Sequence, residues 1–327
     1  MARHATVVLG FICLLLATAG TRADETVRVG ALKFGTVNWE LDTIAANGFD
    51  KAAGVTMQVT YFAGEDASAI AFQAGDVDVI VSDWLDVARL RAEGQDVTFA
   101  PYSSSTGAIM VPKDSPIQSL ADIKGKRLGV AGGAFDKSWL LLQGLAATQG
   151  FDLARENDLA FGAPPLLSET LRNGGLDAAL NYWHFNARLE AEGFRRIAGA
   201  DDAATALGAE GAVSTLGYVF HEKWAGEHPA AIRGFLAASH QAKERLKGSD
   251  AEWNRLHEAG VVKDEGKALE TLRERYRDGI PDRPVAEEEA DAARLFEVLA
   301  KLGGVKLVGR AKALPAGTYW QGLKDGG

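Results

Sequence analysis

The stretch FQAGDVDVIVSDWLDVARLRAEG, Phe72–Gly94, recurs as LRNGGLDAALNYWHFNARLEAEG, Leu171–Gly193, at an offset of 99 residues. The same offset aligns Arg28 with Arg127. A single duplication of such long period does not make a solenoid, which needs several shorter repeats. It predicts one βα-rich design that is used twice, once in each of two lobes.

The segments around the duplication alternate between strand-like and helix-like patterns. Val55–Tyr61 alternates apolar and polar residues, as a strand does, whereas Trp84–Glu93 has a helical pattern. Strands and helices alternating at this spacing predict mostly parallel sheets covered by helices on both faces. The predicted fold class is therefore α/β, with two such lobes joined by a two-stranded hinge.

The order of these elements sets the expected domain boundaries. The chain is expected to cross between lobes near Ser105–Val111 and to return near Ala212–Gly217. Lobe 1 is predicted to comprise residues 24–108 and 214–327, and lobe 2 residues 109–213. Amphipathic helices are expected to fill the C-terminal region and to pack on one of the lobes.

The first 23 residues differ in character from the rest. Arg3 and His4 precede an apolar run, Ala5–Ala19, and small residues then lead to Ala23. This pattern predicts a secretory signal peptide cleaved near Ala23, because the apolar run is shorter than the ~20 residues of a spanning helix. An uncleaved anchor is the alternative. Cys13, the only cysteine, lies within this segment, so the exported chain would have neither disulfide nor thiol chemistry. The expected location is the periplasm.

Charge and motifs exclude several functions. The formal net charge is −9 and no dense Lys/Arg run occurs, which argues against a nucleic-acid partner. The dinucleotide, phosphate-loop and nucleophile-elbow motifs are missing, so no catalytic residue is assigned and the protein is not expected to be an enzyme. The histidines lack metal-ligand spacing, and no metal or cofactor is expected. Acidic residues such as Glu40, Asp83 and Asp86 leave a hard-cation site open, although solvated loop acids explain them more simply.

Tryptophans follow strands at matching places in the two copies. Trp39 and Trp139 follow the first strand of each copy, and Trp84 and Trp183 follow a later one. Ligands of open parallel sheets bind beyond the carboxyl ends of strands, and rigid aromatics with a few polar groups suit a small-molecule site. The alternative is that each tryptophan wedges a helix onto its sheet. The predicted ligand-binding residues are Asn38, Trp39, Glu40, Asp83, Trp84, Ser104, Asp136, Trp139, Tyr182, Trp183 and His184.

Other charged residues at matching places are expected to be structural. Asp78 and Asp177 each lie in a Gly-x-x-Asp turn that enters a strand, which favours a role in the scaffold. Arg89 and Arg188, within the helices that follow, are assigned to the scaffold as well.

Several motifs along the chain carry a family resemblance: Gly75–Asp78, Ser119–Val130 (SLADIKGKRLGV), Leu176–Ala179 and His228–Ile232. Over Val27–Leu246 the chain resembles substrate-binding proteins of NitT/TauT-type ABC importers. The resemblance implies a type II periplasmic-binding-protein fold, a monomer that closes on a small-molecule solute, and docking on an ABC permease with its ATPase. Known ligands of that family include nitrate, sulfonates such as taurine, bicarbonate and thiamine-precursor pyrimidines.

Two loops depart from the family pattern. Trp183-His184-Phe185 lacks the proline that relatives often carry after the tryptophan, and Asp83-Trp84 stands where many relatives have small residues. Aromatic faces beside carboxylates favour a flat or cationic organic solute over a compact anion. A sulfonate, a pyrimidine and a metal chelate remain open. Two other functions stay in view: a ligand-sensing subunit for a membrane kinase, and a thiamine-pyrimidine-synthase-like enzyme, which the lack of a cysteine-rich motif disfavours.

Overall fold

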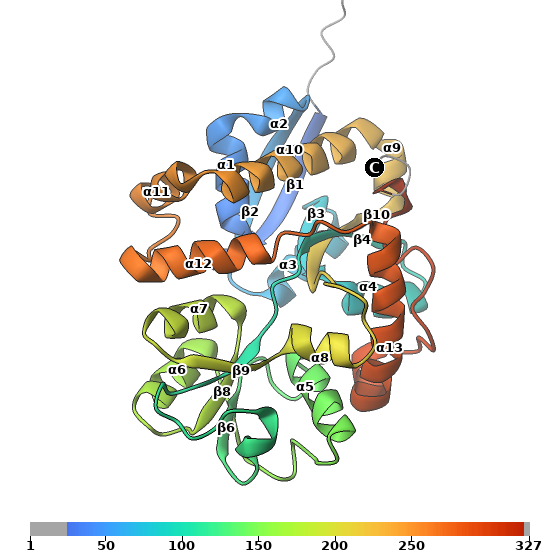
Figure 1. The fold of residues 1–327 in the computed structure, drawn as a ribbon. Helices are drawn as coiled ribbons and strands as arrows, with labels where there is room; N and C mark the ends of the chain where they lie inside the picture. Colours follow the sequence, from blue (N-terminus) through green and yellow to red (C-terminus); the bar gives the residue numbers. More distant parts are fainter. Residues whose placement is uncertain (1–24, 324–327) are drawn as a thin grey trace, which may run out of the picture.

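The computed structural model describes residues 25–323 and shows an α/β protein with two five-stranded sheets (Figure 1). The predicted signal peptide, with Cys13, lies outside the described residues. Among residues 25–323, no helix combines the length and the apolar character that a membrane crossing requires.

The first sheet has the strand order β2-β1-β3-β10-β4, and β10 runs antiparallel to both of its neighbours. We call this sheet and the helices packed on it lobe 1. Its strands are β1 (Glu25–Leu32), β2 (Val55–Phe62), β3 (Val79–Asp83), β4 (Val97–Ser103) and β10 (Leu216–His221). Its helices are α1 (Val37–Asn47), α2 (Phe49–Ala52), α3 (Glu65–Ala74), α4 (Trp84–Ala92), α9 (Glu222–Glu227), α10 (Pro229–Gly248) and α11 (Asp250–Glu258).

The second sheet has the order β7-β6-β8-β5-β9, with β5 antiparallel to its neighbours. This sheet and its helices form lobe 2. Its strands are β5 (Ala108–Val111), β6 (Arg127–Val130), β7 (Asp158–Phe161), β8 (Ala178–Asn181) and β9 (Arg195–Gly199). Its helices are η1 (Leu120–Ile123), α5 (Lys137–Thr148), α6 (Pro164–Arg172), α7 (Trp183–Ala191) and α8 (Ala200–Ala206).

The two sheets match strand for strand, as the duplication predicts. In each sheet the antiparallel strand is the one reached by crossing from the other lobe: β5 follows β4 through residues 104–107, and β10 follows β9 through α8 and residues 207–215. The predicted α/β class with two mostly parallel sheets and a two-stranded hinge is confirmed. The residue boundaries 24–108 with 214–327 and 109–213 remain a proposal.

A matched ion pair fixes the equivalent strands in both lobes. The Arg28 guanidinium lies 2.5 Å from the Asp78 carboxylate, and the Arg127 guanidinium lies 2.7 Å from that of Asp177. Each aspartate also accepts a hydrogen bond from the backbone N–H of its arginine, at 2.8 and 2.9 Å. The pairs join β1 to the start of β3 and β6 to the start of β8. The scaffold role predicted for Asp78 and Asp177 is confirmed.

The two pairs differ in burial and therefore predict different energies. The Asp78 side chain is 6% exposed and that of Asp177 is 33% exposed. We expect Asp78→Asn to lower the free energy of unfolding by about 1–3 kcal/mol, because the hydrogen bonds that this buried carboxylate accepts from Arg28 lose their charge, and Asp177→Asn by less than about 1 kcal/mol. Urea denaturation of both variants measures this, and equal losses would contradict the argument from burial.

The C-terminal helices depart from the prediction, because they pack on both lobes. α12 (Gly266–Asp278) packs against α7, whereas α13 (Val285–Val308) packs against both α4 and α5 (Figure 1). The Arg188 guanidinium lies 2.7 Å from Asp264, and that of Arg275 lies 2.8 Å from Glu190. After α13 the chain pairs with β4 of lobe 1 at Tyr319, and the last described element is η2 (Gln321–Leu323). The apolar stripes reveal that one face of each helix is buried, but not which lobe covers it.

Candidate ligand-binding site

A cavity of about 830 Å³ lies between the two lobes. Lobe 1 contributes residues that follow β1 and β3, lobe 2 contributes residues that follow β6 and β8, and both crossing segments reach the wall. The cavity thus lies beyond the carboxyl ends of parallel strands, where ligands of such sheets bind. Its volume is within the range of small-molecule sites.

The structure brings seven of the predicted ligand-binding residues to the cavity wall from both lobes. They are Asp83, Trp84, Ser104, Asp136, Tyr182, Trp183 and His184. Trp84 and Trp183 are the first residues of α4 and α7, so their indoles stay at the strand–helix junctions that border the cavity. Contact of these residues with a ligand remains a prediction.

The other four predicted residues lie outside the wall of this cavity. Trp39 and Trp139 are the third residues of α1 and α5, where they face inward and are only 6% and 2% exposed. The Asn38 amide donates to the Leu32 carbonyl at 2.9 Å and so closes the turn after β1. A shift of two residues along a helix carries a side chain from the junction to the buried face.

Glu40 is fully buried within lobe 1. Its carboxylate accepts hydrogen bonds from Tyr218 and Ser239, both at 2.6 Å, and pairs with the Lys243 ammonium at 2.5 Å. Burial lowers the pKa of Lys243, and the Glu40 charge opposes this shift. The network joins α1, β10 and α10, so Glu40 is structural.

Trp39 has an indirect relation to the cavity. Its ring makes an edge contact with Trp183, with 5.8 Å between ring centroids, and a second one with Trp253 at 5.5 Å. The buried Trp39 therefore supports a residue of the cavity wall from behind.

An ion pair crosses the cavity from one lobe to the other. The Lys137 ammonium, at the start of α5, lies 2.6 Å from the Asp83 carboxylate, at the end of β3. Burial alone would lower the pKa of Lys137, but the carboxylates of Asp83 and Asp86 outweigh it and raise the pKa. Lys137 is therefore protonated, and the carboxylate with which it pairs belongs to the opposite lobe.

In two further carboxyl groups of the wall, burial outweighs the opposing charge of Lys137. Burial raises the pKa of Asp136, which caps α5 by accepting a hydrogen bond from the Trp139 N–H at 3.0 Å. Partial burial also raises the pKa of Glu65, the first residue of α3. Each shift means that the site disfavours the charged form of the carboxyl group while no ligand cation is near.

His184 is a neutral polar group of the wall. Burial and the nearby Arg188 guanidinium lower its pKa to about 3, so the imidazole is uncharged at neutral pH. Its Nδ1 is buried and has no hydrogen-bond partner among residues 25–323. Buried polar atoms are normally paired, so this nitrogen is available to a group that enters the cavity.

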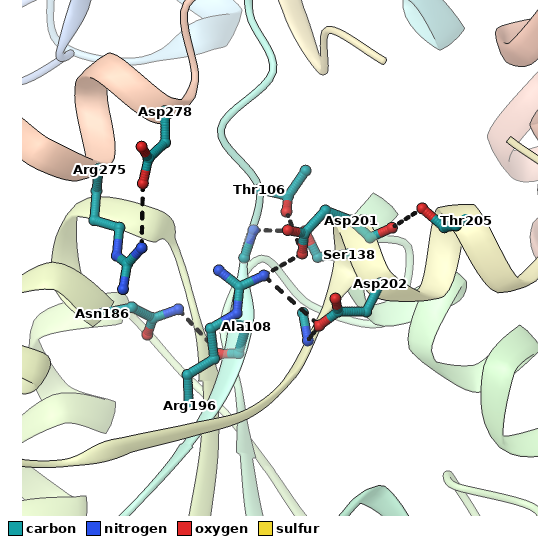
Figure 2. Close-up of polar contacts among 12 residues, drawn as sticks. Thr106, Ala108, Ser138, Asn186, Arg196, Asp201, Asp202, Thr205, Arg275 and Asp278 are labelled. Carbon is teal, nitrogen blue, oxygen red and sulfur yellow. Dashed lines mark hydrogen bonds and ion pairs between the residues drawn. The ribbon is translucent and has the colours of Figure 1, made fainter. Parts of the chain in front are cut away.

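The sequence analysis predicted Ser104 of the first crossing segment, but it missed Thr106 and Gly107 of that segment and the whole of α8, which Figure 2 shows beside the segment. The Gly107 N–H donates to the Ser138 hydroxyl at 3.2 Å, and Thr106 Oγ1 lies 3.5 Å from the Asp201 carboxylate. Arg196 contacts Asp201 and lies 3.9 Å from Asp202. α8 spans only seven residues, too few for a periodic apolar pattern. Its one local signal is Asp202, which accepts a hydrogen bond from the Gly199 N–H.

Comparison with known proteins identifies the fold and a family. A family model described as NMT1/THI5 like matches residues 44–249, whereas curated proteins gave no match. The periplasmic aliphatic sulphonate binding protein SsuA from Escherichia coli superimposes with a TM-score of 0.70 at 18% identity, covering 92% of this chain and 99% of that one. The alkanesulfonate-binding protein SsuA from Xanthomonas axonopodis pv. citri, bound to MOPS, gives 0.65 at 18% identity, with 90% and 98% covered.

An ABC transporter protein from Parabacteroides distasonis gives a TM-score of 0.69 at 16% identity, with 90% and 99% covered. At these identities the matches establish the fold, which is that of periplasmic binding proteins, and leave the ligand open.

Proposed function

Because the chain belongs to the NMT1/THI5-like family, we propose that it is the solute-binding receptor of an ABC importer. Its two lobes would close around a small organic solute and deliver it to a membrane permease with its ATPase. The location proposed is the periplasm, and the receptor would act as a monomer.

The observation that carries this proposal is the cavity between the lobes. Its walls come from the matching strand ends of both sheets, and two short segments, 104–107 and 207–215, connect the sheets beside it. A rotation about these segments would widen or close the cavity without disturbing either sheet. Such hinge closure around a ligand is a common binding mechanism.

A ligand-sensing subunit for a membrane kinase would use the same cavity, and the genes beside this one distinguish the two functions. An enzyme is favoured by one observation only, the THI5 part of the family description. Among residues 25–323, no group of His, Cys, Asp and Glu side chains could hold a metal ion. The solved structures compared above are described as binding or transport proteins.

The direct test is to purify the exported form and to identify what it carries. We expect mass spectrometry of the denatured protein to reveal one small molecule at a 1:1 ratio. Returning that molecule to the emptied protein should change tryptophan fluorescence and lower the radius of gyration in X-ray scattering. A chain that carries no small molecule and keeps its radius in the presence of cell extract would contradict the receptor function.

Two tyrosines of similar exposure, one in the cavity wall and one outside it, provide a matched test of the wall. We expect Tyr182→Ala to weaken binding of the co-purified solute about tenfold, because ring burial and stacking contribute roughly 1–2 kcal/mol. Tyr61→Ala is the control, since Tyr61 is similarly exposed, 47% against 37%, but lies outside the cavity. Trp84 is unsuitable because it is 4% exposed, and alanine there would cost about 3–5 kcal/mol of stability. Equal affinities of both tyrosine variants, by calorimetry, would remove Tyr182 from the site.

A further inference from the structure

We propose that the solute held in this cavity is an organic cation. The inference rests on the proposed receptor function and adds the chemical class of the solute. It is carried by two independent features of the wall, its charge and its exposed rings.

The charge of the wall is strongly negative. Five carboxylate side chains and one ammonium line the cavity. The carboxylates belong to Glu65, Asp83, Asp136, Asp201 and Asp202, and the ammonium to Lys137. Arg196, outside the wall, contacts Asp201 and so offsets part of that charge. An anionic solute would enter a site whose net charge repels it.

Lys137 is not free to receive an anion. It lies 2.6 Å from Asp83, with which it forms a pair that spans the two lobes. An anion that recruited Lys137 would leave Asp83, which is only 15% exposed, without its counter-charge. Breaking one side of a partly buried pair in this way is costly.

Glu65 and Asp136 are the carboxylates that a cation would meet. Neither has an ion pair of its own among residues 25–323, and burial raises the pKa of each although the Lys137 charge opposes the shift. They come from opposite lobes, since Glu65 begins α3 and Asp136 precedes α5. A cation between them would therefore be attracted to both lobes and favour closure.

Exposed aromatic rings supply the second feature. Phe34, Phe135 and Tyr182 line the cavity and are 88%, 43% and 37% exposed. Large apolar side chains exposed at a cavity mark a surface that a ligand covers. Rings beside carboxylates form the usual environment for ammonium groups, because the ring faces attract positive charge. Phe34 follows β1 of lobe 1 and the other two belong to lobe 2, so closure would apply rings to both sides of a solute.

Calorimetry with probes of matched shape tests the charge preference. Choline is compared with its neutral isostere 3,3-dimethylbutan-1-ol, and benzyltrimethylammonium with toluenesulfonate. We expect each cation to bind at least tenfold more tightly than its partner, and added salt to weaken cation binding. Tighter binding of the neutral or anionic partner, or failure of both cations to bind, would overturn the inference.

Charge-only variants locate the effect. Glu65→Gln and Asp136→Asn keep the side-chain shape, and asparagine can still cap α5. We expect each to weaken cation binding about tenfold. Asp66→Asn is the matched control, because Asp66 neighbours Glu65 on α3 but lies outside the cavity wall. Equal affinities of the Glu65 and Asp66 variants would also overturn the inference.

The variant Lys137→Met distinguishes a cationic from an anionic solute, because its expected effects on the binding of the two are opposite. It removes the ammonium that competes for Asp83, so we expect cation binding to strengthen several-fold. A loss of toluenesulfonate binding in this variant would instead identify Lys137 as the contact of an anion and refute the cation class. An anion recovered by mass spectrometry, with closure intact, would refute it as well and leave the receptor function standing. A missing ligand and missing closure would refute the receptor function itself.

Discussion

Lys243→Met is expected to lower the free energy of unfolding by about 3–5 kcal/mol. The Glu40 carboxylate is fully buried, and the Lys243 side chain beside it is 8% exposed. Removing the ammonium leaves a buried negative charge supported only by neutral donors such as Tyr218 and Ser239. Urea denaturation measures the loss.

Two control variants test whether the loss comes from leaving a buried charge without its partner. The double variant Glu40→Gln, Lys243→Met should recover most of the stability, because it removes both charges and keeps an acceptor for Tyr218. Arg172→Met removes an arginine whose side chain is 32% exposed and whose carboxylate partner Glu192 is 42% exposed, and should cost less than about 1 kcal/mol. A loss below about 1 kcal/mol in Lys243→Met would show that the pair stabilises little.

The buried carboxyl group of Glu288, on α13, is expected to contribute less to the stability of the fold as pH rises. Burial raises the pKa of Glu288 to about 7, although Ser214 and Tyr319 donate hydrogen bonds to it. The folded chain therefore holds this proton more tightly than the unfolded chain does. Its contribution is present in full below the ordinary glutamate pKa, 4.5, and disappears as pH rises through about 7. The expected loss is up to about 3 kcal/mol.

Glu288→Gln isolates this contribution from the other titrating groups. We expect the variant to lose less stability than the wild type between about pH 5 and pH 8, and to be the more stable of the two above the pKa of Glu288. Thermal unfolding of both proteins across this range provides the measurement. Parallel pH profiles would show that Glu288 does not titrate in this window.

The sequence predicts the fold well wherever the two copies reinforce each other. The ion pair of Arg28 with Asp78 and that of Arg127 with Asp177 follow the offset of the repeat. The crossing near residues 104–107 follows from the order of strands, because β4 and β5 belong to different sheets. Local pattern and duplication agree at these places, so the tertiary structure has little to add.

The candidate site is predicted only in part, for reasons of geometry. Trp39 and Trp84 both follow strands and both are buried, yet only Trp84, the first residue of its helix, borders the cavity, whereas Trp39 is the third residue of its helix and does not. Asp201 and Asp202 reach the wall through a helix too short to show a pattern. Lys137 acquires its role from Asp83 in the opposite lobe, and no local pattern reports a partner so distant along the chain.

The packing of α12 on lobe 2 sets how solute exchange must proceed. Beyond its two crossing segments, the chain joins the lobes again at its C-terminal helices, because α12 contacts both α7 and α11, and α13 packs against both α4 and α5. Wide opening must therefore break the contacts of α12 on one side, either those with lobe 2, such as the nearby Arg188–Asp264 pair, or those with lobe 1, such as the Arg277–Asp250 pair at 2.8 Å. Both routes make the release rate of the solute depend on side chains that lie outside the cavity wall, so residence time can change through substitutions there while the contacts to the solute stay the same.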